Sequence, residues 1–262
     1  MKKILSVIKL ACIAWIIVPL LTGCVSTKNV PYFQDISSAE TSVIPNVSTF
    51  KEPTIQPDDI LSISIFTIDP TTSMVINQIG TQSLALNQAT NASNSGFLVD
   101  KNGEIELSVI GKVKLLGLTT FQARDLIYAK AALSYKDPNV QVRYANFKIT
   151  VLGEVKSPAT YTVPNEKVTV LDALGMAGDL TIYGKRENVL LVRDNNGEKQ
   201  FARLNLNSAD LFKSSFYYLK QNDVLYIEPN KGKAASLNTA RAQTITLVGT
   251  ALTVIIALIS RL

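Results

Sequence analysis

The sequence predicts an α+β fold in two consecutive domains, followed by a C-terminal transmembrane helix. Three observations carry this prediction. Short runs in which apolar and polar residues alternate, typical of half-buried strands, recur between residues 60 and 229. Amphipathic stretches at helical spacing interrupt these runs. The chain then closes with a segment that carries no charged residue from position 242 to 260.

The first 23 residues have the organisation of a secretory signal. Two lysines follow Met1, and an apolar run at 10–21 is too short for a stable membrane anchor. The run closes with the letters LTGC, which resemble the lipobox of bacterial lipoproteins, so Cys24 is predicted to be the first mature residue and to carry lipid. Val25 replaces the Asp that usually retains such proteins in the inner membrane, which favours the outer membrane. An ordinary signal peptide with a chance Cys and an uncleaved anchor are the alternatives.

The composition excludes several chemistries. The chain has no His, Cys12 is removed with the signal, and lipid blocks Cys24, so imidazole, thiolate and His or Cys metal sites are not expected. Removal of the three signal lysines lowers the formal net charge from +5 to +2, which argues against nucleic acid as a partner. We therefore expect no cofactor and no metal.

Residues 24–52 are rich in Ser, Thr, Asn and Pro and are predicted to form a tether between the lipid and the fold. The first domain is predicted at 53–146. It should contain a strand at 60–66, a long polar excursion at 69–97, and a hairpin whose strands 97–100 and 104–107 flank the turn at 101–103. A strand at 110–115, a helix from the N-cap Thr119 to 134 and a strand at 140–144 should follow.

The second domain is predicted at 147–229. Two strands joined by a turn containing Pro occupy 148–161, and a short amphipathic helix begins at 170 and ends in the glycines at 175–178. A strand at 189–193 leads into a turn at 195–197. The segment 219–229 closes the domain.

At this point the sequence resembles a known family, the Wza-like polysaccharide export proteins. The stretches IQPDDILSISIF and GFLVDKNGEIELSVIGKVKLLGLT are similar to the signatures of their polysaccharide export domain. The stretches VLGEVKSPATY, VLDALGMAGDLTIYG and NVLLVR resemble the β-grasp SLBB domain, of which this chain has length for one copy. The resemblance covers nearly all of 53–229. Asp58 departs from it, since the family commonly has Gly before the acid that matches Asp59.

The resemblance implies an assembly and a task. It implies an oligomeric ring, with an octamer as the expected size, in which one C-terminal helix per subunit builds a barrel in the outer membrane. It also implies polysaccharide as the transported substrate, an inner-membrane polysaccharide co-polymerase as partner, and no enzymatic activity. The carboxylate pairs Asp58 with Asp59 and Glu104 with Glu106 are of the kind that glycosidases use. However, adjacent strand residues point to opposite faces, and the Glu pair adjoins a turn, so structural roles are favoured.

Residues 230–262 are predicted to be a linker and the transmembrane helix. At 1.5 Å per residue, the 19 uncharged positions reach about 28 Å, close to the ~30 Å thickness of a bilayer core. Polar and small residues recur every three or four positions and form one stripe: Gln243, Thr246, Thr250, Thr253, Ala257 and Ser260. The stripe could line a pore, where hydroxyls would meet passing sugars, or it could serve tight helix–helix packing; both interpretations stay open.

These expectations combine into one functional hypothesis. The protein is expected to be an outer-membrane lipoprotein with a largely periplasmic body, which forms an oligomeric translocon for capsular or extracellular polysaccharide. The alternative is a monomeric periplasmic glycan-binding lipoprotein that acts as an accessory factor in polysaccharide assembly.

Overall fold

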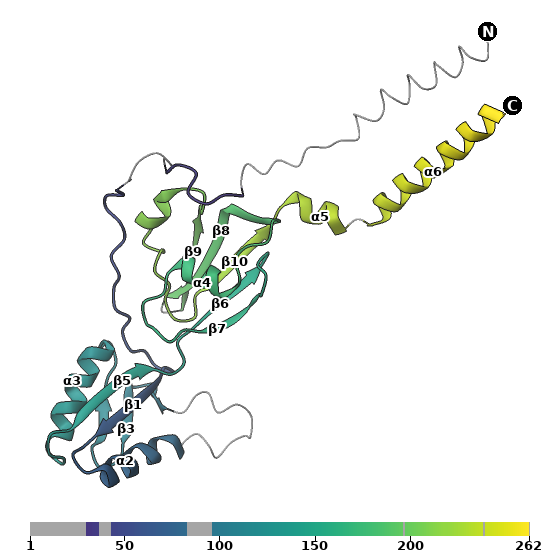
Figure 1. Cartoon of the computed structure of the whole chain (residues 1–262). Coiled ribbons are helices and arrows are strands. Elements are labelled where there is room, and N and C mark those ends of the chain that lie inside the picture. The colour runs from purple at the N-terminus through teal and green to yellow at the C-terminus, as the bar shows by residue number, and fades with distance from the viewer. Residues whose placement is uncertain (1–29, 37–42, 83–95, 196, 238, 262) are drawn as a thin grey trace.

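The computed structural model of the chain describes residues 30–36, 43–82, 96–195, 197–237 and 239–261. The predicted signal segment and Cys24 lie outside these residues. Figure 1 shows two domains arranged end to end, with the C-terminal helices α5 (Lys231–Leu237) and α6 (Thr239–Arg261) leaving the second domain on the side away from the first. The second domain therefore lies between the first domain and α6.

A three-stranded antiparallel sheet forms the base of the first domain. Its central strand, β1 (Ile60–Phe66), pairs with β2 (Phe97–Leu98) on one side and with β5 (Asn139–Tyr144) on the other. The alternation in β1 buries Leu61, Ile63 and Ile65 and leaves the intervening side chains less covered. The predicted strands at 60–66 and 140–144 are confirmed.

Helix α3 (Thr120–Ala131) packs on this sheet through Ala123, Ile127 and Ala131, all fully buried. It begins where the sequence predicts, because Thr119 forms a capping box with Gln122: the Thr side chain accepts from the Gln amide, and the Gln side chain accepts from the Thr amide.

The predicted polar excursion at 69–97 is wrong for its first part, which is helix α2 (Pro70–Gln82). The helix starts because Asp69 accepts hydrogen bonds from the amides of Thr71 and Thr72, and Pro70 stands at the first helical position. Asn77 then ties the helix to β1, since its side chain exchanges two hydrogen bonds with the backbone of Ile65 at 3.0 and 3.2 Å. Residues 83–95 lie outside the described part of the chain.

The two strands of the predicted hairpin do not pair with each other. Strand β3 (Glu104–Leu107) pairs with β4 (Gly111–Lys114), whereas β2 pairs with β1. The turn at 100–103 does form, with the amide of Gly103 donating to Asp100 at 2.9 Å, but it connects two separate sheets. Gly103 has a φ of +76° and an added Cβ would lie 2.2 Å from the Leu116 Cβ, so Leu115 and Leu116 close against this turn.

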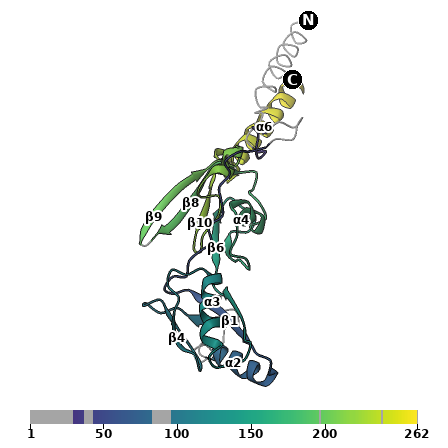
Figure 2. The same cartoon turned by 90° about the vertical axis from the view of Figure 1, so that its left-hand side faces the viewer.

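The second domain is a five-stranded mixed sheet in the order β7-β6-β10-β8-β9. Its strands are β6 (Lys148–Gly153), β7 (Ala159–Thr162), β8 (Gly184–Asn195), β9 (Glu198–Leu204) and β10 (Val224–Pro229), with β6 and β10 parallel. Helix α4 (Val170–Met176), capped by Thr169 and Asp172, lies beside one face of the sheet (Figure 2). The predicted strand–turn–strand and short helix are confirmed, β8 is longer than predicted, and β10 forms within the closing segment 219–229.

The predicted tether binds the second domain along its described parts, 30–36 and 43–52, which we call the N-terminal strap. The amides of Phe33 and Gln34 donate to Leu206 and Asn207 at 3.1 and 2.7 Å. Asp35 caps the 3-10 helix η2 (Ala209–Lys213) by accepting from the Ala209 amide at 2.9 Å. The strap is therefore part of the folded surface, which its Ser-, Thr- and Pro-rich composition did not indicate.

The predicted transmembrane helix requires a correction. A helix does occupy Thr239–Arg261. However, within the described ranges of the chain, no helix combines the length and the apolar character needed to cross a membrane. The C-terminal span is therefore not supported.

Candidate functional site

The surface of α6 is the first candidate site. Every described side chain from residue 243 onward is exposed, including nine large apolar ones with exposed fractions of 41–69%. They are Ile245, Leu247, Val248, Leu252, Val254, Ile255, Ile256, Leu258 and Ile259. Water is a poor solvent for such a surface, so a helix of this kind is suited to association with other apolar groups.

The predicted polar stripe is described in part. Gln243, Thr246 and Thr250 are exposed on α6, whereas the side chains of Thr253, Ala257 and Ser260 lie outside the described residues. The Thr250 hydroxyl lies 3.1 Å from the Thr246 carbonyl and 2.9 Å from the Leu247 carbonyl, to which it can donate. Once that proton is used, the oxygen still offers acceptor lone pairs to the hydroxyl groups of a sugar.

The base of the C-terminal helices is fastened to the second domain. The amide of Asn230 donates to the Tyr183 carbonyl at 2.7 Å, and Lys233 forms a 3.2 Å ion pair with Glu154. The N-terminal strap is held nearby. The Tyr32 hydroxyl donates to Asp179, which begins the loop that contains Tyr183. The loop 179–183, which precedes β8, therefore contacts the N-terminal strap through Asp179 and the residue before α5 through Tyr183.

The junction between the domains is the second candidate site, and Asp59 is at its centre. One carboxylate oxygen accepts from the Gln56 amide at 2.8 Å, and the other accepts from the side chain of Gln221, in the second domain, at 2.9 Å. Asp59 is 7% exposed, and burial raises its pKa from 3.8 to about 6. The neighbouring carboxylate of Asp58 raises it further, whereas the two hydrogen bonds lower it.

The two carboxylate pairs that the sequence singled out do not act as pairs. Asp58 is exposed, with a φ of +70° that favours Gly, whereas Asp59 is buried at the junction. On β3, Glu104 and Glu106 stand opposite Lys114 and Lys112 of β4.

A buried ion pair inside the second domain was not predicted. Arg193 and Asp223 have side chains that are 6% and 0% exposed, and they form three hydrogen bonds of 2.6–3.2 Å. The carboxylate also accepts from the Lys220 amide at 2.7 Å, and the guanidinium donates to the Tyr218 carbonyl at 3.0 Å. The carboxylate of Asp223 accepts these hydrogen bonds from groups within the second domain itself, so this pair is structural.

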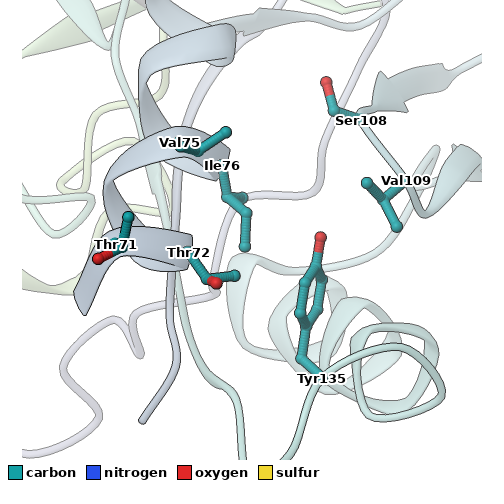
Figure 3. A pocket seen from close by; sticks show the side chains of 7 residues that line it. All are labelled: Thr71, Thr72, Val75, Ile76, Ser108, Val109 and Tyr135. Atoms are coloured by element: carbon teal, nitrogen blue, oxygen red, sulfur yellow. The ribbon is translucent and has the colours of Figure 1, made fainter. Parts of the chain in front are cut away.

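A shallow hollow of about 280 Å³ lies between α2 and the β3–β4 turn. Its lining is Thr71, Thr72, Val75, Ile76, Ser108, Val109 and Tyr135. Figure 3 shows Ile76, Val109 and Tyr135 directed toward the same space from three different segments. The lining has no carboxylate or cation, so the hollow is not equipped for acid–base chemistry. Over the part of the chain that the structure describes, no cluster of acidic, His or Cys side chains has the form of a metal site.

Two domain families match the chain. The model described as polysaccharide biosynthesis/export protein matches residues 48–145, and the SLBB domain matches residues 148–202, so the two together span more than half of the chain. The boundary between them falls at the junction around Asn146.

Two curated relatives are similar over part of their length. The EPS I polysaccharide export outer membrane protein EpsA of Ralstonia nicotianae is 34% identical over 113 residues, which are 42% of this chain and 29% of that protein. The protein of the same name from Ralstonia solanacearum is 32% identical over 131 residues, 47% of this chain and 34% of that protein. The match thus spans about a third of each relative.

The two matched domains define a class of protein built from a polysaccharide biosynthesis/export domain followed by one SLBB domain. The chain belongs to the Wza-like polysaccharide export family.

Proposed function

We propose that this protein is the outer-membrane component of an exporter for capsular or extracellular polysaccharide. The observation that carries the proposal is the order of the two matched domains, with the export domain at 48–145 followed directly by the SLBB domain at 148–202. Two relatives with this similarity bear the name of polysaccharide export outer membrane proteins. Lipid on Cys24 would attach the chain to the membrane, and the body would extend into the periplasm.

The working unit in this proposal is a ring of copies, in which α6 of each copy packs against α6 of its neighbours. The exposed apolar side chains of α6 support it, because contact with equivalent helices would remove them from water at roughly 25 cal/mol per Å² of apolar surface. Closed rings form when one contact repeats by rotation. The stripe that contains Gln243, Thr246 and Thr250 would then face the path of the polymer.

The proposal gives the protein a passive chemical role. Polymer would pass along hydroxyl groups and acceptor oxygens that bind each sugar weakly, and the protein would make and break no covalent bond. The first domain lies at the end of the molecule far from α6 (Figure 1), which supports the proposal that it meets an inner-membrane polysaccharide co-polymerase.

Loss of the chain from its host tests the export role. We expect polymer to disappear from the medium and to accumulate inside the envelope, and re-expression of the wild-type chain to restore secretion. Unchanged secretion would contradict the proposal. A moderate reduction with normal polymer length would favour the alternative, an accessory glycan-binding protein.

Substitution in the stripe tests the path. Thr246→Val and Thr250→Val remove hydroxyl groups with little change in volume, and we expect both to lower the secretion rate at normal protein levels. Thr244→Val is the matched control, since Thr244 is exposed on the same helix but lies off the stripe. Equal effects of all three would contradict a specific role of the stripe.

A further inference from the structure

The two domains have separate hydrophobic cores that meet through very few side chains. One core gathers around Leu61, Ile105 and Ile127, and the other around Ile149, Leu191 and Leu225. Tyr144, at the end of β5, packs against both cores. Since the buried residues of the described chain form two separate clusters, polar contacts at the junction have a large share in setting the relative position of the domains.

A small polar cluster makes these contacts. Gln221, in the turn before β10, donates to Asp59 at 2.9 Å and lies 3.4 Å from the side-chain oxygen of Asn146. Asn146 in turn accepts from the Ile60 amide at 3.0 Å and donates to the Asp58 carbonyl at 3.2 Å. The start of β1, the interdomain connection and the second domain are thus linked through one carboxylate and two amides.

The charges around the cluster are mostly of one sign. Asp58 adjoins Asp59, and the charges of Asp59 and Glu166 both act on Tyr144. Glu166 forms a second contact between the domains by accepting from the Thr120 hydroxyl at 3.1 Å. Two other charged groups act on Glu166. The acidic Glu52 raises its pKa, and the cationic Arg143 lowers it.

The protonation states respond to this arrangement. Burial raises the pKa of Asp59 to about 6 and raises the pKa of Glu166. Burial, followed by the charges of Asp59 and Glu166, also raises the pKa of Tyr144, whose buried hydroxyl has no hydrogen-bond partner. The Tyr144 hydroxyl therefore stays neutral, and the Asp59 carboxylate gains a proton as the solution becomes mildly acidic.

We propose that the domain junction is a proton-sensitive hinge, which is looser while the Asp59 carboxylate is charged and closes when that carboxyl binds a proton. The direction follows from solvation. Opening would expose the charged carboxylate to water, which favours the open form, whereas a neutral carboxyl gains less from water and keeps its contacts with Gln221. Closure would shift the first domain relative to α6 and so change the shape of the assembled exporter.

The expected size of the effect comes from the two pKa values. If opening returns the pKa of Asp59 from about 6 to 3.8, the ratio of open to closed molecules falls about tenfold between pH 7.5 and pH 5.0. The sign is fixed: a carboxyl whose pKa is raised in the closed form stabilises that form as the pH falls through about 6.

Distances between spin labels in the full-length chain test the hinge. Cysteines introduced by Lys112→Cys in the first domain and Glu198→Cys in the second occupy exposed positions, and chains with one introduced cysteine show any background labelling. We expect the wild-type distance distribution to be broad at pH 7.5 and narrow at pH 5.0. The Asp59→Asn variant should give one narrow distribution at both values.

Two variants keep the result interpretable. Asp58→Asn is the matched control, because Asn tolerates the positive φ at this position and removes only the neighbouring charge; it should retain the transition at a somewhat lower pH. Gln221→Ala removes the contact across the junction and should give a broad distribution at both pH values. The hinge would be refuted if the wild-type distribution did not change with pH, or if Asp59→Asn retained the full change.

Discussion

Removal of one partner from the buried Arg193–Asp223 pair should be among the most damaging single changes in the second domain. The Asp223→Ala substitution leaves the guanidinium of Arg193, with a side chain only 6% exposed, without its three hydrogen bonds to the carboxylate. Loss of one member of a buried pair typically costs about 3–5 kcal/mol, because a desolvated charge stays behind. The Lys220 amide would also lose its acceptor.

Urea unfolding followed by far-ultraviolet circular dichroism measures this cost. We expect the free energy of unfolding to fall by about 3–5 kcal/mol, and the melting temperature to fall by roughly 6–20 °C at ~2–4 °C per kcal/mol. Asp223→Asn should lose less, since the amide oxygen can still accept from the Lys220 amide. Lys213→Ala, which removes an exposed ion pair with Asp210, is the control and should cost less than about 1 kcal/mol. Asp223→Ala within 1 kcal/mol of wild type would refute this reasoning.

Three further predictions concern other sites. Gly153→Ala should give little soluble protein, because its φ is +93° and the new Cβ would lie 2.1 Å from the Ile227 carbonyl oxygen; the control Gly197→Ala, with a φ of +87° but open space, should cost only about 1–3 kcal/mol. Asp35→Ala should release the strap and speed proteolysis within 30–52, and unchanged cleavage would contradict the strap contact. Asp59→Asn should abolish the gain in stability that wild type shows as the pH falls from about 6 toward 4, measured by urea unfolding across that range; a persistent gain would assign it to another group.

Most of the correctly predicted strands were identified from the alternation of apolar and polar residues. It identified β1, β5 and β6, and the same alternation contained a signal for the buried charges. Asp59 stands in phase with the buried Leu61, and Arg193 in phase with the buried Leu191. A charged residue at a strand position whose side chain is buried is expected to have a hydrogen-bonded partner. However, only the register between β8 and β10 identifies Asp223 as the partner of Arg193.

Other features depended on contacts that a local pattern does not contain. Helix α2 was missed because Thr, Ser, Asn and Gln outnumber its apolar residues and it carries no charge. It is held by the Asp69 cap and by the contact of Asn77 with β1. The strap was missed for a similar reason, since Phe33 stacks on the distant ring of Phe212 at 5.1 Å. The pairing of β3 with β4 was missed because a turn at 101–103 does not specify which strand its flanking segments join.

The mass of the complex extracted from membranes in mild detergent tests the central claim most directly. Native mass spectrometry of the full chain should give one species whose protein mass is a fixed multiple of the protomer mass, consistent with a closed ring. Replacing exposed apolar residues of α6 with Ser, as in Leu252→Ser with Ile256→Ser, should shift that species toward smaller masses. A wild-type mass near that of a single protomer would contradict the account.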